Sequence, residues 1–459
     1  MLSGHIVGKA EELPSRGGAC GHVHHKLVVG QITKAKSYRK LDPATTKLGG
    51  RCTRKYVITV RAAVRKKALR TCGSLALPTS CATFQRMKTI VVGAGIAGAS
   101  AAFHLTELGV DVDIVDNDAP GRATYAGAGI ICPWLSKNHD QHYQTLSFAA
   151  FRYYESLVTR LKALGQTGIQ YDLVGGLAVA ESPDQLGPIV QRLERHLDDG
   201  VKEVGDIRVL DKGGPRELFP YLDSRLAGIY LSGAARLSGE SVRTALLDAA
   251  TQGGARKLSG KAALERSGDS VVGIRLNGDL LRADSIIVAG GSWSTNLCRP
   301  LGIELGLEPQ RGQIIHLKVE ETSTGAWPVI VPVLNDYYLL AFPDSRIVVG
   351  ATRETGSGFD ARVTAGGVAE VLREGLAIAP DLAKATLAEV RVGLRPMTKD
   401  GLPLIGRPAQ LRSLIIATGM GRYGLTIGPY SGRLAAQLAT GQSVDIDLTP
   451  YQPDRRYPR

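Results

Sequence analysis

Two arginines in the last fifth of the chain have the setting of residues that bind a carboxylate. Arg395 lies in the segment GLRPMTKDG, between a glycine and a proline, and a guanidinium on so restricted a backbone is suited to two parallel hydrogen bonds with a carboxylate. Arg422 follows 27 positions later in a glycine-rich loop. Arg395 could instead fix a turn, and Arg422 could contact a phosphate or a cofactor. The pattern predicts a site for a small carboxylic acid.

A glycine-rich motif near residue 90 predicts a binding site for a dinucleotide. The segment KTIVVGAGIAGASAAFHLTELG reads as a strand, a turn and a helix, and a second strand, VDVDIVD, ends at Asp116. Gly93 allows the tight turn, Gly95 lets the backbone approach a pyrophosphate, and Gly98 lets helix and strand pack closely. The helix N-terminus offers free N–H groups to the phosphates. Asp116 lies where a carboxylate accepts hydrogen bonds from ribose hydroxyls.

Three further segments favour a flavin over a nicotinamide. The slim loop GRATYAGAGI follows Asp116, and the apolar strands in ADSIIVAGGSWS and RSLIIATGMGRYGLTIGP also end in glycine. The helix after the last of these strands could direct its N–H groups at the part of a flavin ring where negative charge appears on reduction. One nucleotide held by segments so far apart in the sequence suggests FAD.

These segments together resemble the family of FAD-dependent glycine oxidases and D-amino-acid oxidases and dehydrogenases. The resemblance runs from Met87 to about Ala439 and rests on GAGIAGASAAFHL, GRATYAGAGI, PQRGQ, DYYLLAFPDSRIVVGAT, GLRPMTKDGLPLIGRP and ATGMGRYGLTIGP. It implies that Arg395 binds the substrate carboxylate with the help of Tyr338, and that Arg422 lines the face of the ring. Tyr338 could equally be a packed aromatic residue of a sheet.

The motif and the resemblance together imply a set of residues that bind FAD. The expected contacts are Gly93, Gly95, Ile96, Ala97, Gly98, Asp116, Asn117, Ala123, Thr124, Ala128, Gly129, Ile130, Gly291, Gly421, Arg422, Tyr423, Gly424, Leu425 and Thr426. The neighbouring sarcosine-oxidase branch joins its flavin to a cysteine near the segment that matches RPMTKDG. This sequence has no cysteine there, so non-covalent FAD is expected.

The expected chemistry needs few protein side chains. We find no Ser–His–Asp order, no paired carboxylates and no metal-binding spacing near these segments, and no catalytic residue is assigned. If the carboxylate is held and the amine is neutral, the Cα hydrogen can leave as hydride to flavin N5, and the imine then hydrolyses to a 2-oxo acid and ammonia. The leading hypothesis is a flavoprotein oxidoreductase that oxidises a small D-amino acid or glycine.

Three other functions remain open from the sequence. The carboxylate site would also suit a flavin dehydrogenase of a 2-hydroxy acid or an enzyme acting on an N-methyl amino acid, and a non-catalytic FAD-binding protein could retain the same motifs. The sequence does not distinguish O₂ from a quinone as electron acceptor. It also leaves open the exact substrate, its stereochemistry and the oligomeric state.

The positive charge of the chain lies almost entirely in its first 86 residues. The formal net charge is +13, and residues 1–86 contain 17 Lys and Arg against three acidic residues. The body is therefore close to neutral, which argues against a nucleic-acid partner. Residues 1–86 are expected to be an unstructured basic leader, either sequence upstream of a natural start at Met87 or a transit segment. The first reading predicts a cytoplasmic enzyme and the second a mitochondrial one.

The fold expected from these patterns is α/β, with a Rossmann-type FAD-binding domain and an inserted substrate domain on a mainly antiparallel sheet. The resemblance assigns residues 87–137, 229–296 and 386–448 to the FAD-binding domain and residues 138–228 and 297–385 to the substrate domain. Residues 449–459 are expected to be loose. The sequence contains no run of about 18 apolar residues that would predict a transmembrane segment. Contact with a membrane surface stays open.

Overall fold

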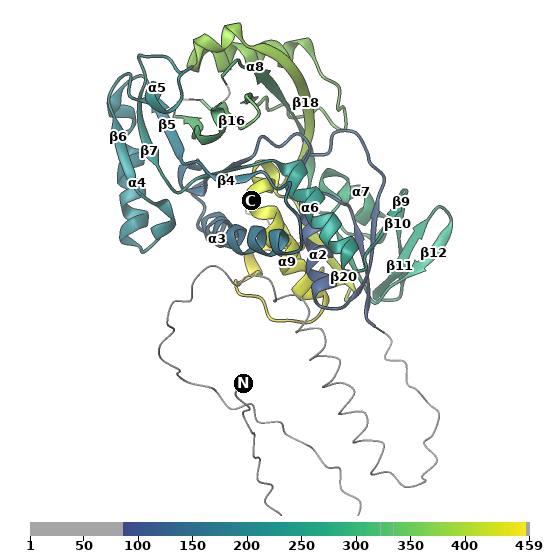
Figure 1. Cartoon of the computed structure of the whole chain (residues 1–459). Helices are drawn as coiled ribbons and strands as arrows, with labels where there is room; N and C mark the ends of the chain where they lie inside the picture. Colours follow the sequence, from purple (N-terminus) through teal and green to yellow (C-terminus); the bar gives the residue numbers. More distant parts are fainter. Residues whose placement is uncertain (1–85, 322, 334, 456–459) are drawn as a thin grey trace, which may run out of the picture. The chain divides into compact units, whose positions relative to one another are not determined.

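Two large β-sheets organise the part of the chain that the structure describes (Figure 1). The computed structural model describes residues 86–321, 323–333 and 335–455, so the expectations for the leader lie almost wholly outside it. The strand orders are β19-β20-β13-β1-β2-β9 in the first sheet and β18-β14-β17-β16-β15-β5-β7-β6 in the second. The α/β class expected from the sequence, with a Rossmann-type FAD-binding domain, is confirmed.

The six-stranded sheet is parallel except at one edge. Its parallel strands are β1 (Lys88–Val92), β2 (Asp111–Asp116), β9 (Arg256–Ser259), β13 (Ser285–Val288) and β20 (Leu414–Thr418), and β19 (Leu404–Gly406) is antiparallel to β20. The apolar runs of β1, β13 and β20 are buried on both faces, as expected for parallel strands with covered faces.

Helices cover one face of this sheet and a small antiparallel sheet covers the other. The helices are α2 (Ile96–Glu107), α6 (Gly239–Gln252) and α9 (Gly424–Ala439). At the crossing of α2 and α9, a Cβ on Gly432 would lie 2.3 Å from the carbonyl oxygen of Ala97. The small sheet contains β10 (Ala262–Ser267), β11 (Ser270–Leu276) and β12 (Asp279–Arg282), and its buried side chains form a core with alternate residues of β1 and β13.

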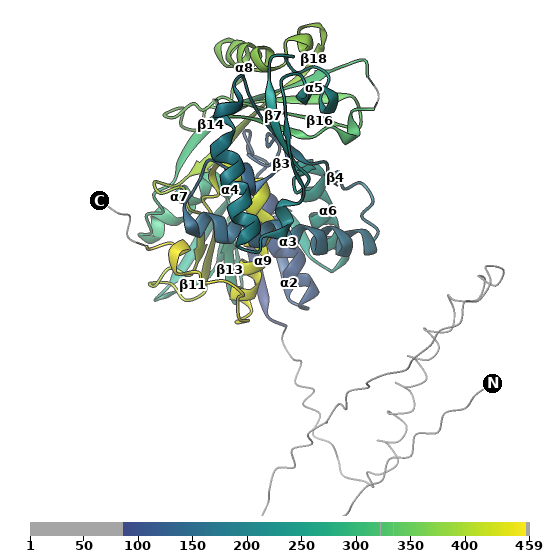
Figure 2. The ribbon, with the colours of Figure 1, turned by 90° about the vertical axis from the view of Figure 1, so that its left-hand side faces the viewer.

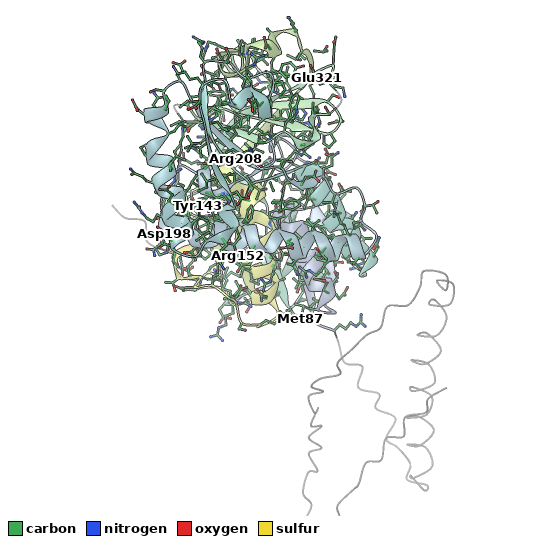
Figure 3. All side chains as sticks on the ribbon, turned by 60° about the vertical axis from the view of Figure 1, so that its left-hand side comes forward. Met87, Tyr143, Arg152, Asp198, Arg208 and Glu321 are labelled. Carbon is green, nitrogen blue, oxygen red and sulfur yellow. The ribbon has the colours of Figure 1, made fainter. Side chains whose placement is uncertain are left out.

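The eight-stranded sheet is antiparallel apart from the pair β15 and β5. Its strands are β5 (Gly176–Ala180), β6 (Ile207–Leu210), β7 (Ala227–Leu231), β14 (Glu308–Lys318), β15 (Val329–Pro332), β16 (Tyr338–Phe342), β17 (Arg346–Gly350) and β18 (Thr386–Met397). Helix α8 (Ala365–Ile378) lies on one face of this sheet (Figure 1), where Val371 and Ile378 pack into its core. Arg208 on the edge strand β6 points outward (Figure 3).

A third sheet connects the two large ones. It contains β3 (Ile130–Ile131), β8 (Ala235–Leu237) and β4 (Tyr171–Leu173). Arg236 on β8 is buried, donates hydrogen bonds to the carbonyl oxygens of Gly325 and Ala341, and forms an ion pair with Asp172. The helices α3 (Gln141–Ala163) and α4 (Gly187–Asp198) lie beside this region (Figure 2), and α5 (Pro215–Leu218) and α7 (Ser294–Cys298) are short.

The sheet in which some strands pair differs from the domain to which the sequence analysis assigned them. Strand β18 was expected in the FAD-binding domain because residues 386–448 were assigned there, yet it pairs with β14 along its length in the eight-stranded sheet. The boundary at 229 falls inside β7 of the same sheet. Both differences have one cause, since the residues of a strand carry no local signal of the sheet in which that strand pairs.

The expectation of a loose tail was wrong for residues 449–455. Thr449–Tyr451 forms a short 3-10 helix, and the buried Tyr451 donates a hydrogen bond to the carbonyl oxygen of His142. Arg455 forms an ion pair with Asp400. These contacts join the tail to two distant segments, which the composition of the tail could not indicate. None of the helices described by the structure is long and apolar enough to span a bilayer.

Candidate active site

One cavity of about 610 Å³ is lined by both large sheets. At one end it follows the carboxyl ends of β1, β2, β13 and β20, the edge at which open α/β sheets bind their ligands. At the other end its walls are residues of β14, β16 and β18 in the eight-stranded sheet. The segments predicted from sequence to bind a dinucleotide and a carboxylate therefore border the same space.

The three glycines of the GAGIAG turn have three different surroundings. Gly93 has a φ of +106°, and a Cβ there would lie 2.5 Å from the carbonyl oxygen of Ala289. A Cβ on Gly98 would lie 1.8 Å from the carbonyl oxygen of Gly93, so these two positions have no room for a side chain. A Cβ on Gly95 would have only the Thr124 hydroxyl nearby, at 3.6 Å. It would therefore point into the cavity and occupy the place of a ligand.

Hydrogen bonds hold this turn in position. The Asp116 carboxylate, at the end of β2, accepts hydrogen bonds from the N–H groups of Ala94 (2.5 Å) and Asp118 (2.8 Å). The Thr124 hydroxyl accepts one from the N–H of Ile96, at 3.1 Å, in the first turn of α2. Asp116 also lines the cavity, and it can accept further hydrogen bonds from a ligand because a carboxylate has about four lone-pair sites.

The loop after Asp116 forms a thin wall of the cavity. A Cβ on Gly129 would lie 1.8 Å from the carbonyl oxygen of Leu237, and one on Gly127 would lie 2.6 Å from the side chain of Leu425. The loop can therefore lie flat between the cavity and the elements behind it. This is the close approach that the run of small residues in GRATYAGAGI predicts.

The cavity brings together all but two of the predicted cofactor residues. The lining includes Gly93, Gly95, Ile96, Ala97, Asp116, Asn117, Ala123, Thr124, Ala128, Gly129, Ile130, Gly291, Gly421, Arg422, Gly424, Leu425 and Thr426. Gly98 lies behind the turn. Tyr423 points away from the cavity, with its ring 4.3 Å from that of Tyr143, which lies on α3 (Figure 3). Its hydroxyl accepts a hydrogen bond from Ser136 at 3.4 Å.

Some residues of the lining carried no recognisable signal in the sequence. Lys261 lies in the turn between β9 and β10, Ala262 and Leu264 lie on β10, and Trp293 follows β13. Arg122 lies in the GRATYAGAGI loop and forms an ion pair with Asp118. Only the folding of the chain brings these side chains beside the dinucleotide motif.

The predicted carboxylate-binding residues Tyr338, Arg395 and Arg422 all border the cavity. Nη1 of Arg395 donates a hydrogen bond to the carbonyl oxygen of Thr352 at 3.0 Å. A Cβ on Gly312, on the neighbouring strand β14, would lie 2.3 Å from that nitrogen. A Cβ on Gly350 would similarly lie 2.8 Å from the Tyr338 hydroxyl. Glycine at these positions leaves room for the arginine and the tyrosine.

Alternation along β16 sends two adjacent tyrosines to opposite faces, as the sequence predicts. Tyr338 points to the cavity, whereas the hydroxyl of Tyr337 donates a hydrogen bond to Glu370 on α8. Burial raises the pKa of Tyr338, although the nearby Arg395 lowers it in part. Tyr338 is therefore a neutral hydrogen-bond donor at neutral pH.

Burial also lowers the pKa of the Arg395 guanidinium, and the positive charges of Arg353 and Arg422 lower it further, while Tyr338 acts in the opposite direction. An arginine remains protonated in proteins, so the lowered pKa indicates a cation that lacks a compensating anion. Among the residues that the structure describes, Arg395 has no ion pair. The arrangement favours an anionic ligand beside Arg395 and Tyr338.

A single carboxylate, Asp336, lies near the other cations at this end of the cavity. Its oxygens are 3.1 Å from Nζ of Lys137, 3.5 Å from Nη2 of Arg353 and 3.6 Å from Nη1 of Arg422. Burial raises the pKa of Asp336, but the hydrogen bond from Lys137 and the two guanidinium groups outweigh it and keep the pKa below its usual range. Sequence reasoning missed Arg353, because the segment GATRE has no recognisable carboxylate-binding pattern.

The cysteine nearest the flavin loop is not part of the lining. Cys132 is buried behind β3, and burial raises the pKa of its thiol to about 12. A neutral, buried thiol is a poor nucleophile, as expected from the sequence. Within the described residues there is no cluster of three or more His, Cys, Asp or Glu that could hold a metal ion.

The end of the cavity formed by the GAGIAG turn and Asp116, called the cradle below, fits FAD. The open face of Gly95 leaves space for a pyrophosphate, Asp116 borders the cavity where a ribose would bind, and the cavity continues to the end lined by Tyr338, Arg395 and Arg422. A mononucleotide would occupy only the first part of this space. The residues that would hold the flavin half come from the loop at 123–130 and from the N-terminus of α9.

Comparison with known proteins agrees with this geometry. Residues 88–438 match the family model described as FAD dependent oxidoreductase. The chain is 40% identical over 365 residues to the uncharacterized oxidoreductase YurR of Bacillus subtilis strain 168. This alignment covers 79% of this chain and 98% of YurR. It is 29% identical over 378 residues to the glycine oxidase of Pseudomonas aeruginosa, covering 80% of this chain and 99% of that enzyme.

The fold is also similar to that of a solved flavoenzyme. The iminodiacetate oxidase IdaA of Chelativorans sp. BNC1 matches with a TM-score of 0.77 and 42% identity, over 80% of this chain and 98% of that one. The family match covers the dinucleotide cradle and the strands that carry Tyr338 and Arg395. The chain therefore belongs to the family of FAD-dependent oxidoreductases.

Proposed function

We propose that the protein oxidises the C–N bond of a small amino acid, such as glycine, a D-amino acid or an N-substituted glycine. One observation carries this proposal: Arg395 and Tyr338 border the same cavity as the dinucleotide cradle. A carboxylate bound there is held at the reactive end of a bound FAD. The glycine oxidases among the relatives and the iminodiacetate oxidase act on substrates of this kind, as their names state.

Arg395 and Tyr338 would orient the substrate by its carboxylate. The guanidinium can donate two parallel hydrogen bonds, and the tyrosine hydroxyl can donate a third. The hydrogen bond from Arg395 to the Thr352 carbonyl limits how far the guanidinium can move. Holding the substrate by one group in a fixed orientation is the main way in which such a site lowers the activation barrier.

When bound, FAD supplies the oxidising equivalent, since it accepts two electrons together with the hydrogen of the substrate carbon. Of the described residues that line the cavity, Asp116 is the one carboxylic acid, and it lies at the dinucleotide end; none is a histidine. We therefore expect the amine to lose its proton to water before the reaction. The imine product would hydrolyse in water to a 2-oxo acid and an amine or ammonia.

Three further features of the proposed enzyme stay predictions. FAD is expected to be non-covalent, and no cysteine is found among the described residues of the lining. The electron acceptor is O₂ or a quinone. A cytoplasmic location is expected, and contact with a membrane surface stays possible.

Anaerobic mixing tests the proposed function directly. The purified holoenzyme is mixed without oxygen with glycine, sarcosine, iminodiacetate, D- and L-amino acids and 2-hydroxy acids, and the flavin absorbance is followed. We expect one or more of the amines to bleach the flavin and the 2-hydroxy acids to leave it oxidised. Bleaching by hydroxy acids alone, or by none of these compounds, would contradict the proposal. Readmission of air then distinguishes an oxidase from a dehydrogenase.

A further inference from the structure

We propose that Arg353 and Arg422 form a second anion-binding subsite, so that the preferred substrate is an amino acid with a second carboxylate. This inference rests on the proposed function for the chemistry of the first carboxylate. It predicts, in addition, that the rest of the substrate carries a negative charge.

The cations at this end of the cavity outnumber the acids. Arg395 has no ion pair among the described residues, and Lys137, Arg353 and Arg422 share the single carboxylate of Asp336 at 3.1–3.6 Å. Glu370 and Glu374 lie by Tyr337 on the face of the sheet away from the cavity, and Glu354, which follows Arg353, forms an ion pair with Arg311. One substrate carboxylate at Arg395 would still leave an excess of positive charge.

The guanidinium of Arg422 is available to a ligand. It lines the cavity, and within the described part of the chain its one charged contact is Asp336, at 3.6 Å, with no hydrogen bond. A guanidinium has five N–H donors in a fixed fork, which suits a carboxylate better than a single distant ion pair does. We therefore expect Arg422 to supply the direct contact with the second carboxylate.

Arg353 is not among the residues that line the cavity, and it acts through its positive charge near Arg422 and Tyr338. It follows β17, is three-quarters buried, and donates a hydrogen bond of 2.6 Å to the backbone carbonyl of Asp336. Burial lowers the pKa of Arg353, and the positive charge of Arg422 adds to this effect, whereas Asp336 opposes it. Two like charges so placed repel each other. A second anion between them and the cavity would relieve that repulsion.

Another explanation for the excess charge makes a different prediction. The arginines could stabilise negative charge on a reduced flavin. In that case every substrate would benefit equally, since the effect would not depend on a second carboxylate. Discrimination between mono- and dicarboxylates therefore separates the two explanations.

Unreactive anions provide the first test. The oxidised holoenzyme is titrated with acetate, propionate, malonate and succinate at constant ionic strength, and binding is followed by the perturbation of the flavin absorbance. We expect the dicarboxylates to bind at least tenfold more tightly than the monocarboxylates. Equal affinities would overturn the second subsite. No turnover is needed, so this test is independent of the oxidation chemistry.

A pair of matched variants provides the second test. Arg353→Gln should reduce the ratio of succinate to propionate affinity at least fivefold. Arg362→Gln, on a side chain that is 84% exposed and pairs with Asp360, should leave the ratio unchanged. If Arg353→Gln weakened both anions equally, or changed neither, the proposal would be wrong.

Asp336→Asn tests the same subsite without loss of a cation. Removal of the competing carboxylate should tighten binding of succinate severalfold and alter binding of propionate much less. An equal change for the two anions would contradict the proposal. If Arg353→Gln does not fold, Asp336→Asn still tests the second subsite.

Failure of this inference can be distinguished from failure of the proposed function. If glycine or sarcosine reduces the flavin as efficiently as iminodiacetate and D-aspartate, the second subsite is refuted and the amine chemistry stands. If no amine reduces the flavin, the proposed function fails. The affinities for unreactive anions then still decide whether a second carboxylate binds.

Discussion

Arg395 occupies a place in which few other side chains would fit. Its guanidinium lies against Gly312 of the neighbouring strand, and the Thr352 carbonyl accepts a hydrogen bond from it. A planar fork of donors can bind a carboxylate through two atoms, whereas the ammonium of lysine is a point charge. The role proposed for this residue therefore depends on the shape of the group as well as on its charge.

Arg395→Lys should weaken flavin reduction by carboxylate-bearing amines while FAD remains bound. We expect a loss of about 2 kcal/mol or more in transition-state stabilisation, as for the loss of a bidentate charged contact. The measurement is kcat/KM of the variant, with the flavin absorbance of the purified protein as the control for cofactor content. An unchanged kcat/KM would remove Arg395 from the site.

Gly95→Val should give a folded protein without flavin. A side chain at this position would point into the cavity, with only the Thr124 hydroxyl within 4 Å, so it would exclude the pyrophosphate and leave the fold intact. Absorbance at the flavin bands and circular dichroism measure the two effects. Gly168→Val, at a position with nothing within 4 Å, is the matched control. A yellow Gly95→Val protein with normal absorbance would refute the assignment of this turn.

His316 should make the fold less stable as the pH falls. It is buried, neither ring nitrogen has a hydrogen-bond partner, and burial together with the charge of Arg391 lowers its pKa to about 4. The unfolded chain takes up a proton near pH 6.5, which the folded protein does not. The stabilising effect of the neutral ring is thus complete above pH 6.5 and is lost as the pH falls toward 4.

The lost contribution amounts to about 3 kcal/mol over that range, from the difference between the two pKa values. His316→Leu should therefore flatten the dependence of unfolding free energy on pH between 7 and 4. Urea unfolding at several pH values measures it. His139→Leu, at an exposed position, should retain the slope of the wild type, and an equal slope for His316→Leu would disprove this account.

At the scale of elements, the pairing of β18 with β14 places Arg395, the residue that we propose to bind the substrate carboxylate. The two strands pair from Glu308 and Met397 to Lys318 and Thr386, and Arg395 lies near the end of that pairing, where β18 reaches the cavity. Strand β18 pairs in one domain and its last residues border the cofactor cradle of the other. The resemblance of GLRPMTKDG to a family motif predicted the residue, but not this path of the strand.

Arg236 is expected to stabilise the junction between the third sheet (β3, β8 and β4) and the eight-stranded sheet. Its guanidinium donates hydrogen bonds of 2.9 and 2.6 Å to the carbonyl oxygens of Gly325 and Ala341. Arg236→Met would leave buried carbonyls without a donor, and we expect a loss of about 2 kcal/mol in unfolding free energy. Urea unfolding measures this loss. Arg225→Met, at a largely exposed side chain, should cost much less, and equal losses would contradict the prediction.

At the scale of the whole molecule, bound FAD should link the parts of the fold. The cavity is bordered by both large sheets and by α2 and α9, so a ligand there contacts all of these elements at once. Any ligand that binds the native state alone raises its stability, by about 4 kcal/mol at a free concentration 1,000 times Kd. Stability and cofactor content should therefore change together.

Removal of FAD should lower Tm, and added FAD should restore it in a concentration-dependent way. The measurement is thermal unfolding of the apoprotein over a series of FAD concentrations. The Gly95→Val protein should show no such increase, because its cradle is filled. A Tm of the wild type that does not respond to FAD would show that the cavity is not the cofactor site.

The sequence by itself determined the cofactor class and the main features of the cradle. The glycine turn, Asp116 and the slim loop are contiguous signals, since each depends on backbone conformation over a few residues. Arg395 and Tyr338 could also be predicted from the sequence, because they lie in motifs similar to those of a known family. These local constraints can be read without knowledge of the fold.

Only the tertiary structure decided which charged side chains gather around Arg422 beside the cavity. Arg353, Asp336 and Lys137 lie in three separate segments, and Tyr423 turns away from the cavity although its neighbours line it. Their positions depend on strand pairing and on packing between distant elements, such as β18 on β14. Electrostatic interactions act through space at a few ångströms, so this balance of charges exists only after the chain has folded.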